Sequence, residues 1–455
     1  MGKGKTLWNY FDKLEGDKVV WIIVLMLMLI SVLCMFSSSS RLLVGDQTRL
    51  DIVKGQIFLV IAGLVVIIVC YNIGNLKFLR WCSKWGFALS LALLLPLLAR
   101  VDLGFIRSIE INGARRIIQV GPVQLHVFEV VKVAMALYLS WAMDAFKKGT
   151  LQYFRDDETK QKWLYIYGPF VLTFLLVIPG SNSAALFIGG IMGMVILLGG
   201  GSFKDFAILA AAGVSMLLLC LGIWKVSDGK YLGRIGTGVS RVVQSEDWEA
   251  KALEARTGTK DFFDALDKIR QPYSAKIAVH QGGLLGKGPG RSTQRYVVPD
   301  ISEDYMYSFI IEEYGMMGGL IVLILYVSLL ARGSIIVRNC GNELYAKLAV
   351  AGLTLLISGQ AFLHMLVNVD IGPMTGQTLP LISHGTSAFL CFCVAFGVIL
   401  SISRIANKRI ERERREAEPL MEMHQEVQQG LEDLDEFETG EASGTMEEEE
   451  ELYDI

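Results

Sequence analysis

Charged side chains in and beside long apolar segments are the first candidates for chemistry in this sequence. Arg115 and Arg116 lie just before an apolar segment that contains Glu129 and Lys132. Charge is costly inside a bundle of membrane helices, so each such residue is a functional candidate. Because arginine binds phosphate through two parallel hydrogen bonds, this group can hold a phosphate. A structural ion pair between Glu129 and Lys132, which share a helix face, is an equally good interpretation.

A second candidate is Asp304, which follows Ser302 and Glu303 and leads into another apolar segment. A carboxylate here can act as a general base that takes a proton from a nucleophile. The alternative is that Ser302 caps a helix whose first-turn acids favour the helix dipole. Glu312 lies about 12 Å further along a helix, too far to share one reacting atom with Asp304. The spacing therefore favours a mechanism with a single base.

The glycine-rich stretch 282–292 contains five glycines together with Lys287 and Ser292. A nucleotide-binding P-loop needs four residues between its first Gly and the Gly-Lys pair, followed by Ser or Thr. Here three residues separate Gly282 from Gly286, and Gly288 follows Lys287. This excludes a P-loop, but such a loop can still approach a ligand closely. Lys287 and Ser292 are thus candidate substrate-binding residues.

Another candidate is the irregular polar segment 368–387, which enters an apolar helix. Irregular backbone at membrane depth is tolerated only where it is buried in protein or lines a cavity. We therefore expect Ser383 and His384 to face a cavity. The alternative for His384 is a hydrogen-bonded structural histidine.

The elements that must position these residues are membrane helices. Of the 455 residues, 52% are hydrophobic and only 20% are charged, which excludes a soluble multi-domain enzyme, a disulfide-rich secreted module and a disordered chain. The sequence predicts an all-α, polytopic integral membrane protein with ten transmembrane helices and one large extracytoplasmic loop. The ten predicted spans are 19–36, 56–74, 85–99, 123–146, 163–179, 183–200, 206–224, 306–331, 348–369 and 379–403. The seven cysteines fall in or beside apolar segments, so neither a disulfide framework nor a Cys-x-x-Cys metal site is expected.

Basic residues in the short loops predict the orientation, because they concentrate on the cytoplasmic side. They place both termini in the cytoplasm. The predicted regions are a cytoplasmic N-terminus at 1–18, helices within 19–224, an extracytoplasmic loop at 225–305, helices within 306–403 and a tail at 404–455. The loop is long enough to cross the membrane regardless of its charge. Its stretch 248–269 has helical periodicity, which suits either a helix on the membrane surface or one packed on the loop.

Charge divides the chain into two parts. The segment 404–455 has 6 Lys/Arg and 18 Asp/Glu, a charge of −12, so the other residues sum to +9 against the total of −3. Such a tail is expected to be disordered. It serves either as a docking segment or as a solvated extension.

Several motifs, in order and spacing, resemble those of the SEDS family of bacterial envelope proteins. The likeness covers most of residues 10–405. Its motifs are Gly283-x-x-Gly286-x-Gly288-x-Gly290-x-Ser292, Tyr296-x-x-Pro299, Asp304, Glu312-Glu313-x-Gly315, Asn112-Gly113-x-Arg115-Arg116, Glu129-x-x-Lys132 and Thr375-Gly376-x-x-Leu379-Pro380-x-x-Ser383-x-Gly385. The last motif favours the division branch of the family over the elongation branch.

The resemblance implies a peptidoglycan glycosyltransferase that joins lipid II units at the outer face of the cytoplasmic (inner) membrane. Asp304 stands at the family's catalytic aspartate. It would deprotonate a sugar hydroxyl, with inversion at the donor carbon. Arg115, Arg116 and Lys132 would stabilise the departing lipid diphosphate, with Glu129 and a divalent cation (Mg or Mn) as a further option. Expected partners are a class B penicillin-binding protein, other division proteins and membrane lipid, but no nucleic acid.

Three departures from the family pattern affect the lining of the cavity. Ser302-Glu303 replaces a His-Thr pair before the aspartate, Pro179–Ser183 lacks the family's acid, and His126-Val127-Phe128 replaces Gln-Pro-Ser. Two other functions remain open: a carrier that moves lipid-linked precursor across the membrane, and a non-catalytic scaffold for division proteins. The carrier needs no base, and the scaffold needs the tail but not Asp304.

Overall fold

The computed structural model describes residues 15–38, 48–99, 101–102, 104–111, 114–121, 123–226, 245–257, 259–298, 301–372 and 375–451. Contacts divide the chain into a body, Met1–Arg404, and a tail, Ile405–Ile455. The described helices are α2 (Lys18–Ser38), α3 (Arg49–Asn72), α4 (Leu76–Leu98), α5 (Val127–Lys147), α6 (Glu158–Lys162), α7 (Gly168–Val177), α8 (Asn182–Leu198), α9 (Phe203–Val226), α11 (Ser245–Glu254), α12 (Lys260–Gly282), α13 (Met306–Asn339), α14 (Leu344–Asn368) and α15 (Thr386–Glu451). The helix α15 begins in the body and continues into the tail. A π-helical turn, Trp163–Tyr167, joins α6 to α7, and a short 3-10 helix covers Gln294–Tyr296.

Each predicted span overlaps a helix in the described residues, although the first seven residues of the span 379–403 are not helical, because α15 begins at Thr386. Six of the helices are long and apolar enough to cross a membrane. They are α2, α3, α4, α13, α14 and α15. The helix α5 is not among them, because it carries four charged residues, Glu129, Lys132, Asp144 and Lys147. Lys132 and Asp144 are buried, as expected for charges that face the interior of a bundle. The chain is therefore a multi-pass membrane protein.

A three-stranded antiparallel sheet interrupts the helices between α4 and α5. Its strands are β1 (Ile106–Ile111), β2 (Ala114–Val120) and β3 (Val123–His126), in the order β1-β2-β3. The prediction of an all-α chain is wrong here, because these segments are rich in the β-branched residues Ile and Val, which favour strands. The span predicted over 123–146 accordingly starts as strand and becomes helical only at Val127.

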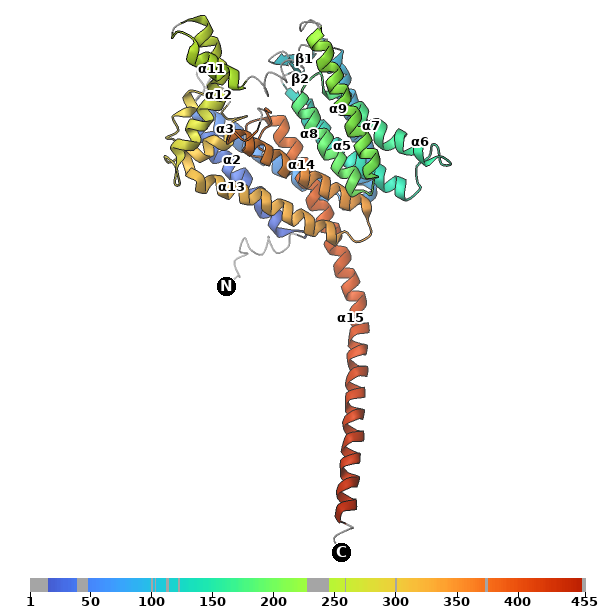
Figure 1. The fold of residues 1–455 in the computed structure, drawn as a ribbon. Helices are drawn as coiled ribbons and strands as arrows, with labels where there is room; N and C mark the ends of the chain where they lie inside the picture. The colour runs from blue at the N-terminus through green and yellow to red at the C-terminus, as the bar shows by residue number, and fades with distance from the viewer. Residues whose placement is uncertain are drawn as a thin grey trace. The chain divides into compact units, whose positions relative to one another are not determined.

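The helix α5 packs against helices from both earlier and later parts of the chain. It packs against α4, α8 and α14, and α14 also packs along α13 (Figure 1). Met135 and Leu139 of α5, Ile188 and Val195 of α8 and Leu348 of α14 belong to one buried cluster. This packing holds the start of α13 and the end of α14 in fixed positions, and both carry site residues.

A charge network joins α4 and α5 to the turn between α13 and α14. Arg80 contacts Asp144 at 3.1 Å and Glu343 at 2.5 Å, and Lys148 contacts the same two acids at 3.0 and 3.3 Å. Burial raises the pKa of Glu343, but hydrogen bonds from Arg80 and Lys148 outweigh it and hold that pKa below its usual range.

The tail is helical as far as Glu451, where the sequence predicts disorder. Its residues are mostly good helix formers such as Glu, Arg, Met and Leu. Charge pairs one helical turn apart add support, as in Arg409–Glu413 and Glu411–Arg415.

Candidate active site

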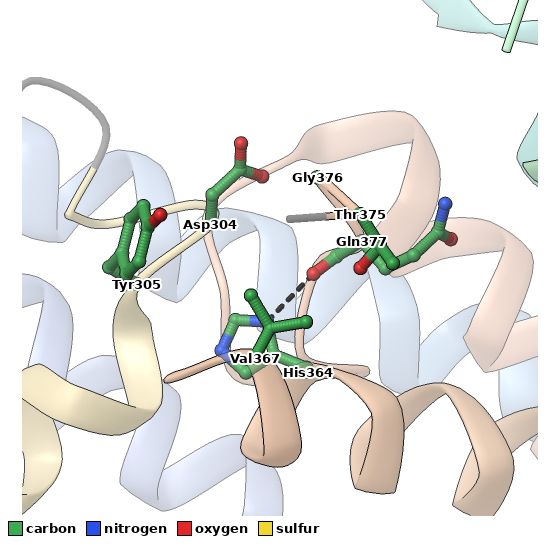
Figure 2. Close-up of a pocket in the computed structure, with 7 residues that line it drawn as sticks. All are labelled: Asp304, Tyr305, His364, Val367, Thr375, Gly376 and Gln377. Atoms are coloured by element: carbon green, nitrogen blue, oxygen red, sulfur yellow. Dashed lines mark hydrogen bonds between the residues drawn. The ribbon is translucent and has the colours of Figure 1, made fainter. Parts of the chain in front are cut away.

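Asp304 lies in the turn directly before α13 and lines a small cavity (Figure 2). The cavity has a volume of about 20 Å³ and is lined by Asp304, Tyr305, His364, Val367, Thr375, Gly376 and Gln377. This is room for about one water-sized group. A Cβ placed on Gly376 would lie 3.5 Å from Oδ2 of Asp304, so the carboxylate faces the 375–377 backbone. Figure 2 shows it directed away from the His364 ring.

Two side chains of α14 hold this turn by bonding to backbone groups. Asn368 donates from Nδ2 to the carbonyl of Asp304 at 3.1 Å, and its Oδ1 accepts from the N–H of Ser308 at 2.9 Å. His364 accepts from the N–H of Tyr307 at Nε2, at 3.3 Å. These contacts satisfy N–H groups of the first turn of α13, which have no partner inside the helix.

The contacts of His364 also define its tautomer. Because Nε2 accepts a hydrogen bond, the ring proton must be on Nδ1. Nδ1 lies 2.7 Å from the carbonyl of Gln377 and donates to it. The ring thus connects the start of α13 to the backbone that faces Asp304.

Ser383 and His384 contact the same turn from its other side. The Ser383 hydroxyl donates to the carbonyl of Glu303 at 2.8 Å, and the N–H of His384 donates to the carbonyl of Ser302 at 2.8 Å. Ser383 is buried and positions backbone. The His384 ring is about one-third exposed, and its Nδ1 lies 3.4 Å from Oε1 of Glu303.

Lys132 is buried and contacts three acceptors. Its Nζ lies 2.7 Å from Oε1 of Glu129, of Gln360 and of Gln377. An ammonium has three donors, so all of them are used. Lys132 fixes the side chain of Gln377, which lines the cavity. Its positive charge therefore lies one residue away from the cavity, and the carboxylate of Glu129 balances part of that charge.

The two neighbouring arginines have different surroundings. Successive strand residues point to opposite faces, and Arg115 and Arg116 are adjacent in β2. Arg115 contacts Glu110 at 3.3 Å and Ser108 at 2.8 Å within the sheet. Arg116 donates from Nε to the carbonyl of Gly180 at 3.3 Å. Asn112 and Gly113 of the same motif lie outside the described residues.

Lys287 and Ser292 contact Glu312, whose side chain is fully buried. Lys287 donates to Glu312 at 2.6 Å, to Thr293 at 2.8 Å and to Gln281 at 2.5 Å. The hydroxyl of Ser292 donates to the other Glu312 oxygen at 2.5 Å. The glycine-rich stretch therefore folds around an acid of α13.

The glycines of this stretch are required by a close approach to a kink in α13. Gly315 has φ +70°, and a Cβ there would lie 2.2 Å from the carbonyl oxygen of Leu284. A Cβ on Gly286 would lie 2.3 Å from the carbonyl oxygen of Glu313. The N–H groups of Lys287 and Gly288 donate to α13 carbonyls at 2.9 Å. The loop thus pairs with protein backbone.

Of the predicted site residues, Asp304, Ser383 and His384 come together at the turn before α13, and Lys132 with Glu129 lies behind the cavity. Lys287 and Ser292 belong to the separate cluster around Glu312. Gln360, His364 and Asn368 were not predicted. They recur every fourth residue in an apolar helix, which places three polar side chains on one face, and that signal could have identified them.

A resident metal ion would need several ligand side chains gathered around one point. Among the described residues, no group of three or more His, Cys, Asp or Glu side chains is gathered as ligands would be. Glu129, which the sequence suggested as a ligand, is paired with Lys132. The described residues of the candidate site therefore do not form a metal site.

Comparison with known proteins gives consistent matches. The family model of the FtsW, RodA and SpoVE cell cycle proteins matches residues 17–408. A relative from Hahella chejuensis, "Probable peptidoglycan glycosyltransferase FtsW", is 28% identical over 350 residues, covering 75% of this chain and 78% of the relative.

Two solved structures share the fold. A chain from a study of "polymerization and crosslinking by a peptidoglycan synthase complex" aligns with a TM-score of 0.60 at 18% identity, covering 86% of this chain and 98% of that one. The rod shape determining protein RodA of Thermus thermophilus aligns with a TM-score of 0.54 at 18% identity, covering 86% and 98%.

Proposed function

Because this chain belongs to the FtsW, RodA and SpoVE family of cell cycle proteins, we propose that it is a peptidoglycan glycosyltransferase that polymerises lipid II during cell division. The family confirms the resemblance drawn from the motifs. Relatives named as FtsW glycosyltransferases support the activity, and the division role rests on the same names.

The position of Asp304 is the observation that supports this function best. Its carboxylate faces the Gly376 backbone in a cavity with room for one water-sized group, the size of a sugar hydroxyl. In the proposed reaction Asp304 takes the proton of that hydroxyl as the oxygen attacks the donor sugar. The bond from the donor carbon to the diphosphate breaks on the opposite face, so one displacement inverts that carbon.

The departing lipid diphosphate develops negative charge, which nearby cations stabilise. We assign this role to Arg116, with Lys132 contributing its charge from behind Gln377. Arg115 is a weaker candidate than the sequence suggests, because Glu110 and Ser108 already hold its guanidinium.

For the membrane arrangement we propose ten spans, with α5, α7 with its π-helical turn, α8 and α9 crossing beside the six apolar helices. The charges of α5 are compatible with this, because Lys132 and Asp144 are buried, Glu129 is paired with Lys132 and Lys147 stands at the end of the helix. The basic loops support cytoplasmic termini, which puts Asp304 and the segment 225–305 outside the inner membrane.

A class B penicillin-binding protein is the partner we propose, with other division proteins joining the assembly. The fold match to a peptidoglycan synthase complex that coordinates polymerization with crosslinking supports such a partner. An enzyme that makes glycan strands needs a second activity to crosslink them.

Polymerisation of labelled lipid II by purified protein tests the proposal. We expect Asp304→Asn to lower the rate by about 10²- to 10⁴-fold, the usual contribution of a general base. Asp370→Asn is the matched control, since Asp370 is an exposed acid paired with Lys276 at 2.7 Å, and it should keep the parent rate. Full activity of Asp304→Asn would refute the assignment. Parallel reactions with Mg²⁺, Mn²⁺ or EDTA test the divalent cation.

A further inference from the structure

Glu303 and His384 form a carboxylate–imidazole pair immediately beside Asp304. Nδ1 of His384 lies 3.4 Å from Oε1 of Glu303, and the two side chains are 36% and 44% exposed. The backbones are also joined, because the N–H of His384 donates to the carbonyl of Ser302 at 2.8 Å. The pair is therefore held in place yet reachable by a ligand.

This contact orients the imidazole ring. Because Nδ1 faces Glu303, Nε2 is directed away from that carboxylate. A protonated ring would donate Nδ1–H to Glu303 and have Nε2–H available for a second acceptor. Histidine is the side chain that most readily changes charge near neutral pH.

Other charged groups face this pair from each neighbouring element. Asp304 is adjacent in the turn before α13. The N–H of His126, at the end of β3, donates to the Ser387 hydroxyl at 3.0 Å, three residues after His384 in the sequence. His126 interacts electrostatically with Glu303, and also with Arg116 of β2 and with Glu129 and Lys132 of α5.

Two of the other predicted cations, Lys132 and Arg115, have little to offer an anion directly. Lys132 has three acceptors at 2.7 Å, and Arg115 is held by Glu110 and Ser108. A diphosphate needs hydrogen-bond donors as well as charge. A protonated His384 provides both, and its backbone N–H is bonded to the carbonyl of Ser302, in the turn that carries the base.

We propose that protonated His384, oriented by Glu303, binds the diphosphate of the isoprenoid-linked donor and of the product that leaves. This inference rests on the proposed function and deepens it. It makes diphosphate binding depend on pH, with tighter binding when the imidazole is charged. Glu303 is a positioning residue, because its carboxylate stabilises the imidazolium without touching the ligand.

Farnesyl diphosphate is a suitable probe, because it carries the same diphosphate on a short isoprenoid. Its affinity can be measured by thermal shift of the purified full-length protein, without turnover. For the parent protein we expect binding about tenfold weaker, or about 1.4 kcal/mol, at about pH 8 than at about pH 6. His384→Gln should lose that tenfold at the lower pH and bind with little pH dependence. Glu303→Gln removes the carboxylate that orients the ring, so it should weaken binding at the lower pH.

Matched variants and probes locate the effect. His280→Gln, at an exposed histidine of α12, should behave as the parent protein. Inorganic pyrophosphate should show the same pH dependence if the headgroup alone is recognised, whereas farnesol should show none. The Glu303→Gln variant keeps the test valid if His384→Gln folds poorly.

Unchanged binding of farnesyl diphosphate to His384→Gln at both pH values would overturn the proposal. So would a loss of the pH dependence in His126→Gln but not in His384→Gln. The assay separates this failure from failure of the glycosyltransferase assignment. A fully active Asp304→Asn variant would refute the base, while diphosphate binding by that same variant would still report on His384.

Discussion

Replacing Lys287 by methionine distinguishes a ligand-binding loop from a structural one. The sequence alone makes Lys287 a substrate contact, whereas the structure pairs it with Glu312 at 2.6 Å. The Glu312 side chain is fully buried and that of Lys287 is 23% exposed. Breaking a buried ion pair costs about 3–5 kcal/mol. Because Glu312 keeps donors from Ser292 and Thr293, we expect a smaller loss, about 2–3 kcal/mol.

A double-mutant cycle isolates this contact. Glu312→Gln should cost about 3–5 kcal/mol, because its amide nitrogen would meet donors where a carboxylate oxygen now accepts. In the Glu312→Gln background, Lys287→Met should cost under about 1 kcal/mol, a coupling of about 1–3 kcal/mol. The free energy of unfolding can be measured by SDS titration in mixed micelles, followed by tryptophan fluorescence.

The control is Lys276→Met, which removes a more exposed lysine paired with Asp370. Exposed pairs contribute about 0–1 kcal/mol, so its unfolding free energy should change little. The KM for lipid II is measured on the same samples. A Lys287→Met variant with normal stability and a KM raised about tenfold, or about 1.4 kcal/mol, would refute the structural role.

Two further changes follow from the described contacts. Gly315→Ala adds a Cβ that would lie 2.2 Å from a backbone oxygen, at a residue with φ +70°. Backbone strain of about 1–3 kcal/mol, together with this clash, should sharply reduce the amount of folded protein in size-exclusion profiles. The control Gly190→Ala, where the new Cβ meets no atom within 4 Å, should leave that amount unchanged. For Glu343, whose folded pKa lies below the usual value, the stabilisation by Arg80 and Lys148 exists above the unfolded pKa and is lost as pH falls through the folded one. The melting temperature of Glu343→Gln should therefore be below that of the parent protein at neutral pH and equal to it at strongly acidic pH, and a constant difference would contradict this.

Much of the fold follows from hydropathy, because long apolar segments have few alternatives to helix in a membrane. Each predicted span overlaps a helix in the described residues. Segment boundaries were less predictable. The helix α5 begins at Val127, four residues after the predicted start, since the residues before it pair as β3. Apolar content does not distinguish a buried strand from the first turn of a buried helix.

The sheet itself had a sequence signal that hydropathy ignores. Asn-Gly between two alternating segments is typical of a hairpin turn, and Asn112-Gly113 lies between β1 and β2. From the sequence, Asn112 and Gly113 were interpreted only as part of the motif that contains Arg115 and Arg116. A strand assignment would also have separated Arg115 from Arg116, because neighbours in a strand face opposite sides.

The candidate site was only partly predictable, because most of its contacts join side chains to backbone. Asp304 stands out in the sequence, but the residues that hold its turn act on carbonyl and N–H groups. His364 and Asn368 bond to the backbone of residues 304–308, and Ser383 bonds to that of Glu303. No sequence pattern records which distant backbone group a side chain reaches.

The difference between contacts to backbone and contacts between side chains suggests which residues around Asp304 can be substituted without moving its carboxylate. Groups that bond to backbone constrain the position of Asp304 whatever substrate is present, so changes there should disturb rate and stability together. Glu303 and His384 are half-buried and contact each other through side chains, so they can change without displacing the turn. On the proposed function, the same turn would keep one fixed carboxylate while its neighbours set the affinity for the diphosphate and its dependence on pH.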